Sequence, residues 1–77
     1  MFSTHEKMII KALGRRKMSI SELTEKFYKV DVPLGANNYV AGIVRRINNK
    51  CNFNKLPWTI EGKGRGRGGK TIWRQKR

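Results

Sequence analysis

The sequence predicts an α+β domain in which three helices are followed by a two-stranded β-hairpin. Two observations predict the helices: serine–glutamate capping pairs precede two of them, and apolar residues recur every three or four positions. A third observation predicts the hairpin, because after residue 57 apolar and polar residues alternate with a period of two. A chain of 77 residues has the length of one small domain, so we expect residues 1–77 to form a single unit.

The first helix is expected over residues 4–13, and both of its ends carry a signal. Ser3 and Glu6 have the spacing of a capping box, in which each side chain accepts a hydrogen bond from the other residue's backbone N–H. Gly14 stands where helices commonly end, because glycine adopts a left-handed backbone at little cost. These signals predict a short helix with a defined start and stop.

The second and third helices are expected over residues 20–28 and 37–50. Ser19 and Glu22 repeat the capping-box spacing before the second helix. The third helix has one apolar stripe at helical spacing, formed by Val40, Ile43, Val44, Ile47 and Cys51. Its opposite side carries small, amide and guanidinium side chains and no acid. The core therefore does not need this second face, which is free to meet a partner.

The hairpin is expected over residues 58–74. The stretch WTIEG alternates apolar and polar residues, and KTIWR does so again after the glycine- and arginine-rich segment KGRGRGG. We expect Trp58, Ile60 and Ile72 to close the hairpin over the core, with Trp73 on its other face. The segment between the two strands then becomes a long basic tip.

Charge is the strongest indication of a partner. Eighteen Lys and Arg residues face five acids, which gives a net charge of +13. Eleven basic residues and one acidic residue lie in the range 32–77. A positive field of this size attracts polyanions and destabilises the folded chain by self-repulsion, so it favours a polyanionic partner.

The segment GRGRGGKT, residues 64–71, matches the phosphate-binding P-loop pattern letter for letter. A P-loop needs a helix directly after it, and the six residues that follow Thr71 predict no helix. A distal acid for magnesium is also needed, and the only aspartate, Asp31, precedes Pro33 in an expected turn. One histidine and one cysteine predict no zinc site, and so few acids predict no catalytic set. We therefore expect neither an enzyme nor a metal or other cofactor.

The order helix, helix, turn, helix, hairpin resembles the winged helix-turn-helix DNA-binding superfamily over roughly residues 3–75. The resemblance depends on the stretch SISELTEKF…ANNYVAGIVRRI and on the wing-like WTIEGKGRGRGGKTIWR. The connection YKVDVPLGA is longer than the turn of simple helix-turn-helix motifs. The resemblance implies that the third helix enters the major groove, while the hairpin wing reaches a minor groove or the backbone.

The residues on the outward face of the third helix suit that use. Arg45 can bind guanine and Asn38 can bind adenine through two hydrogen bonds each. Ala41 and Gly42 would allow a close approach, although Gly42 would also suit close packing against another helix. The full set of expected contacts is Asn37, Asn38, Ala41, Gly42, Arg45, Arg46, Asn49 and Lys50 on the helix, with Lys63, Arg65, Arg67 and Lys70 on the hairpin.

The sequence thus predicts a small basic DNA-binding protein, a transcriptional regulator or accessory factor. Two alternatives stay open: an RNA-binding protein, ribosome-associated or of the arginine–glycine type, and a protein–protein module that docks on an acidic partner in the transcription machinery. The expected state is a monomer or a weak dimer on DNA. No membrane segment or signal peptide is evident, so we expect an intracellular location, in the cytoplasm, nucleoid or nucleus.

Overall fold

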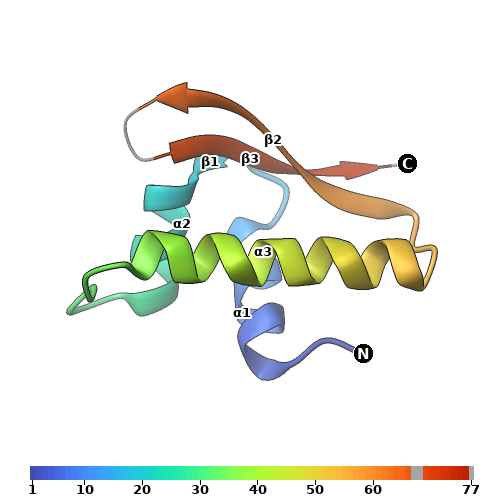
Figure 1. Cartoon of the computed structure of the whole chain (residues 1–77), viewed down its shortest axis with the longest axis horizontal. Helices are drawn as coiled ribbons and strands as arrows, with labels where there is room; N and C mark the ends of the chain where they lie inside the picture. Colours follow the sequence, from blue (N-terminus) through green and yellow to red (C-terminus); the bar gives the residue numbers. More distant parts are fainter. Residues whose placement is uncertain (67–68, 77) are drawn as a thin grey trace.

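The computed structural model describes residues 1–66 and 69–76 and has an α+β architecture, as predicted. Its elements, in chain order, are α1 (Thr4–Leu13), β1 (Met18–Ser19), α2 (Ile20–Tyr28), α3 (Ala36–Phe53), β2 (Trp58–Gly66) and β3 (Gly69–Lys76). Helix α3 runs along the longest dimension of the molecule, with the sheet on one side of it and α1 and α2 behind (Figure 1). The long helix therefore has one packed side and one side open to solvent.

The sheet has three antiparallel strands in the order β1-β3-β2, one more than the sequence analysis predicted. Strand β1 pairs Met18 with Ile72 and Ser19 with Thr71. Two residues are too few to show a period of two, so this strand has no sequence signal of its own. Pairing of β1 covers one edge of β3 and ties the connection between α1 and α2 to the hairpin.

The helix starts follow the capping residues, with two differences from the sequence analysis. Ser3 and Glu6 form the complete capping box of α1. The Ser19 hydroxyl accepts the Glu22 backbone N–H at 3.1 Å, but the Glu22 carboxylate meets that hydroxyl rather than the Ser19 backbone. Helix α3 starts one residue earlier than predicted, after Gly35 in a left-handed conformation, and ends three residues later, at Phe53.

The core lies between the three helices and the inner face of the sheet. It is formed by Ile9, Leu13, Met18, Ile20, Leu23, Val40, Ile43, Val44, Ile47, Cys51, Ile60 and Ile72. The whole apolar stripe predicted for the third helix is buried, and so are Ile60 and Ile72, as expected. Trp58 is half-buried against this core, while Trp73 lies on the opposite sheet face. Within the described residues, no helix combines the length and apolar character needed to cross a bilayer.

Candidate nucleic-acid interface

The outward face of α3 is set by burial of its opposite face. Val40, Ile43 and Ile47 are completely buried, which turns the other side of the helix to solvent. Asn38 and Arg45 lie on that side and are exposed, as is Asn49. Helix α3 contains no acidic residue, so nothing on the helix itself neutralises this face.

A groove of about 440 Å³ separates this helix from the hairpin. Polar and small residues from α3 form one wall, and residues close to the hairpin tip form the other. The lining residues are Ile20, Asn37, Asn38, Ala41, Val44, Arg45, Asn48, Ile60, Glu61, Gly62, Gly69, Lys70 and Ile72. The structure thus brings together five predicted contact residues, four from α3 and Lys70 from the hairpin.

Asn48 holds the hairpin against α3, a role that the sequence analysis did not foresee. Its amide donates to the Ile60 carbonyl and accepts from the Ile60 N–H, both at 2.7 Å. Strand β2 is an edge strand, so these backbone groups have no partner strand on that side. The two bonds occupy them and set the spacing between the two walls of the groove. An asparagine among others on one helix carries no sequence signal that marks it for this contact.

Glu61 also lines the groove, although nothing in the sequence marks it for this position. Its carboxylate accepts a hydrogen bond from the Thr59 hydroxyl at 2.9 Å. A negative charge at this point disfavours a phosphate inside the groove. Anionic groups are therefore favoured at the rim, near Lys63 and Lys70, which are both exposed.

No packing contact with another element explains why position 42 is a glycine. Gly42 lies in the interior of α3, and a Cβ built on it would meet no atom of the described residues within 4 Å, apart from the backbone of its own helix. The alternative that this glycine allows close packing against another helix is therefore wrong. Glycine in a helix interior costs about 1 kcal/mol relative to alanine, so its presence here calls for a reason outside the folded chain.

Lys50 and Arg46 lie on the flank of α3 that faces α1, where the buried Glu6 meets them. The Lys50 ammonium donates to the Glu6 carboxylate at 2.6 Å, and the Arg46 guanidinium is 4.0 Å away from it. Lys50 also donates to the Met1 carbonyl, whereas the Arg46 side chain remains 58% exposed. Lys50 is thus engaged in holding α1 to α3, and Arg46 keeps donors free for solvent or a ligand.

The charges around Glu6 determine its protonation. Burial is the largest single effect and by itself raises the pKa of this carboxyl, whereas the hydrogen bonds donated by Lys50 and by the Ser3 backbone N–H lower it. The positive charges of Lys50 and Arg46 act in the same direction. The net result is a pKa below the ordinary value, so Glu6 is ionised in the folded protein at neutral pH.

Part of the hairpin tip lies outside the described residues. The structure describes the backbone but not the side chain at Arg65, and Arg67 falls in the gap at 67–68. Lys70 and Thr71, the last residues of the P-loop pattern, belong to strand β3, which continues to Lys76. A strand therefore occupies the place where a P-loop needs a helix.

Comparisons with protein-family models, with curated proteins and with solved structures found no match to this chain. In the part of the chain that the structure describes, no three residues among His, Cys, Asp and Glu gather in a way that could hold a metal ion.

Proposed function

We propose that this protein is a winged helix-turn-helix domain that binds duplex DNA through α3 and the β2–β3 hairpin. The order of the helices supports the proposal, as does a hairpin that extends beyond the short pairing with β1. In this reading α3 enters the major groove and the hairpin is the wing. The groove between them then receives one edge of the duplex.

The observation that carries the proposal is the composition of this face of α3. Amide, guanidinium and small side chains cover it, no acid interrupts it, and the hairpin stands beside it at a spacing set by Asn48. Arg45 and Asn38 are exposed and have the donors and acceptors that read guanine and adenine edges. Ala41 and Gly42 keep the helix narrow between them, so that the backbone can come close to the bases.

The exposed lysines of the hairpin and Arg46 bind the phosphates in this proposal. Lys63 and Lys70 are both exposed on the hairpin, and Lys70 lines the groove. Each neutralised phosphate releases counterions, so binding should weaken steeply as salt rises. The arginines at 65 and 67 would extend this contact, as the sequence predicts.

The test is a comparison of two duplexes, one selected from a random library and one of scrambled sequence. Asn38→Ala and Arg45→Ala should each cost about 1–3 kcal/mol on the selected duplex and much less on the scrambled one. Lys26→Ala is the matched control, because Lys26 is exposed on α2 and lines no groove. Equal losses on both duplexes would contradict base reading by α3.

The same measurement, made with RNA, addresses the first alternative. If structured or single-stranded RNA binds more tightly than duplex DNA at equal salt, the chain is an RNA-binding protein instead.

A second candidate function is docking on another protein, and one observation favours it. Val30, Val32 and Leu34 in the connection between α2 and α3 are exposed, and Leu34 is completely so. Exposed apolar side chains that lie close together are typical of protein contacts. A protein complex that survives nuclease treatment and is lost with Leu34→Ser would support this function.

A further inference from the structure

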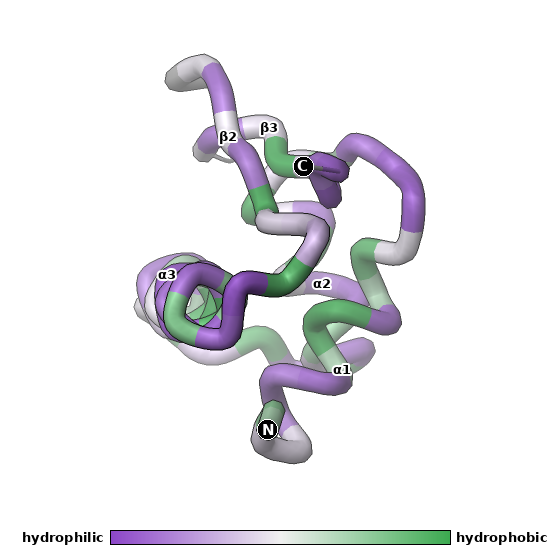
Figure 2. Tube along the Cα trace, turned by 90° about the vertical axis from the view of Figure 1, so that its right-hand side faces the viewer, coloured by the Kyte–Doolittle hydropathy of each residue, from purple (hydrophilic) through white to green (hydrophobic). Residues whose placement is uncertain are grey.

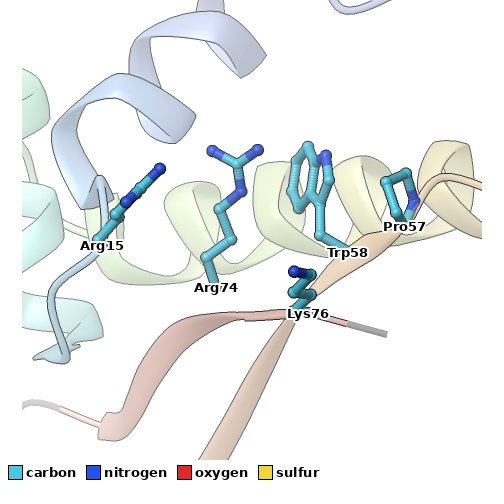
Figure 3. A pocket seen from close by; sticks show the side chains of 5 residues that line it. All are labelled: Arg15, Pro57, Trp58, Arg74 and Lys76. Carbon is cyan, nitrogen blue, oxygen red and sulfur yellow. The ribbon is translucent and has the colours of Figure 1, made fainter.

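A second cleft, of about 510 Å³, lies at the base of the hairpin, away from the groove beside α3. It is lined by Arg15, Pro57, Trp58, Arg74 and Lys76 (Figure 3). The three charged side chains are all basic, and none of the described residues that line the cleft is acidic. The interface proposed above uses none of these residues.

The strands and the segment after α1 bring these side chains together. Trp58 pairs with Lys76, and Arg74 stands two residues before Lys76 on the same strand, so all three lie on one sheet face. Arg15 approaches from the connection that follows α1 (Figure 3). Residues far apart in the sequence thus form one cationic cleft with an aromatic wall.

Arg74 is held in place without losing its ability to bind an anion. Its guanidinium carbon lies 4.1 Å from the centroid of the Trp58 ring, which is a cation–π contact. The N–H donors at its edge stay available, because among the described residues no acid forms a salt bridge with Arg74, Arg15 or Lys76. An oriented guanidinium beside two further cations is suited to a phosphate.

The cleft and the outward face of α3 lie on different sides of the molecule. Figure 2 shows α3 at one side and the connection after α1 at the opposite side. Along β3, Arg74 lies four positions after Lys70, which lines the groove, and this distance is about 13 Å in an extended strand. Because the connection that carries Arg15 lies opposite α3, a duplex that lies against the outward face of α3 leaves the Arg15 side of the cleft free for another phosphate chain.

The basic surface around the cleft is larger than a single phosphate needs. Arg16 and Lys17 are exposed and follow Arg15 directly, and the Lys17 ammonium lies 5.1 Å from the centroid of the Trp73 ring on the other face of the sheet, so the basic surface continues from the cleft around the sheet edge. A small anion cannot reach all these groups at once, whereas a nucleic-acid backbone presents phosphates at regular spacing. This extent favours a polymer over a free anion.

We propose that the cleft binds the backbone phosphates of a second nucleic-acid duplex, so that one molecule can link two duplexes. Binding of phosphates in the cleft does not require α3, whereas linking rests on the proposed function because α3 must hold the first duplex. The two-sided distribution of basic residues accounts for a net charge as high as +13 on so small a chain.

The fluorescence of Trp58 provides a direct test of the cleft. In a Trp73→Phe variant, Trp58 is the only tryptophan, and its emission should change as a short duplex is added. The combined change Arg15→Gln and Lys76→Gln should weaken this response about fivefold or more, since two phosphate contacts are lost. Neither residue stacks on Trp58, so its emission in the free protein should change little.

Two controls sharpen the test. Lys7→Gln with Lys26→Gln removes the same net charge at exposed positions that line neither the cleft nor the groove, and it should leave the response near the wild-type value. Inorganic phosphate distinguishes the two sources of the anion. If it displaces nothing and gives no response of its own, a polymer is the ligand, but if it saturates the response and the duplex adds nothing, the cleft is a small-anion site and the proposal is overturned.

Failure of this proposal differs from failure of the proposed function. With Asn38→Ala and Arg45→Ala in the Trp73→Phe protein, the Trp58 response to duplex should persist. Wild-type protein on an immobilised duplex should also retain a second, labelled duplex, and the Arg15→Gln, Lys76→Gln protein should retain the first duplex but not the second. No Trp58 response, or an equal loss in the lysine control, overturns the proposal, whereas equal losses on selected and scrambled duplexes overturn only the reading by α3.

Discussion

Replacing Gly42 with alanine should make the free protein more stable and its complex weaker. Gly42 lies in the interior of α3, and a Cβ at this position meets no atom within 4 Å. Alanine is favoured over glycine in a helix interior by about 1 kcal/mol, and nothing in the fold opposes that gain. For a domain of this size, a gain of about 1 kcal/mol raises the melting temperature by roughly 4–8 °C.

Gly35→Ala is the matched control. A Cβ on Gly35 also meets no atom within 4 Å, but its φ is +77°, in the left-handed region that disfavours a side chain. Alanine there should destabilise the protein by roughly 1–2 kcal/mol. The two substitutions add the same methyl group to equally open positions. The opposite signs of their effects on the free energy of unfolding therefore isolate the contribution of backbone conformation.

Urea denaturation followed by circular dichroism measures both effects, and a duplex titration measures the consequence for binding. An added methyl in a closely packed contact costs about 1–3 kcal/mol, so the affinity of Gly42→Ala for a selected duplex should fall by about fivefold or more. A less stable Gly42→Ala protein would refute the inference that this position is open. A more stable protein with unchanged affinity would show that the outward face of α3 is not the contact face.

The remaining predictions concern the hairpin contact, the buried carboxylate and the wing. Asn48→Ala leaves the Ile60 backbone groups at the β2 edge unpaired, so it should lower the free energy of unfolding in urea by about 2–3 kcal/mol. The same substitution at the exposed neighbour Asn49 should lower it by about 0.5 kcal/mol or less. Equal losses would contradict the role of Asn48 in holding the hairpin against α3. Because the pKa of Glu6 in the folded protein lies below its ordinary value of 4.5, the carboxylate contributes its full stabilisation above that pH and loses it as the pH falls through the lower, folded-state pKa. Glu6→Gln should therefore show a smaller loss of unfolding free energy on acidification than the wild type, and parallel curves would argue against the ion pair. Lys63→Ala with Lys70→Ala should reduce the dependence of log affinity on log salt concentration by about 1–2 units, and an unchanged slope would remove the hairpin from the interface.

Local signals in the sequence were sufficient to predict the three helices and the hairpin. The Ser3–Glu6 pair acts over one turn, and the apolar stripe of α3 acts along a single helix, so both can be read without knowing what packs where. The outward face of α3 follows from the same stripe by elimination. Strand β1 was not predicted because two residues are too few to show a period. It forms only through pairing with Ile72 and Thr71, which lie far along the chain.

The sequence predicted the types of residue in the candidate interface but not which of them lie next to one another in the fold. The sequence placed Lys50 and Arg45 together on one basic helix, and the fold separates them: Lys50 binds Glu6, 44 positions earlier in the chain, while Arg45 faces the groove. Asn48 and Asn49 are the same residue type in succession, yet only Asn48 reaches the edge of β2. One step along a helix turns a side chain by about 100°, which is enough to change its partner completely.

The sequence by itself determined the elements, the side of α3 that the core covers and the strong positive charge, because these depend on contacts within one element or on composition alone. Only the tertiary structure decided which cations act together. The cleft formed by Arg15, Trp58, Arg74 and Lys76 draws on segments that are separated by more than forty positions, and it exists because β3 pairs with β2 while the connection after α1 packs beside them. Such a site depends on long-range packing, and no local pattern in the chain encodes it.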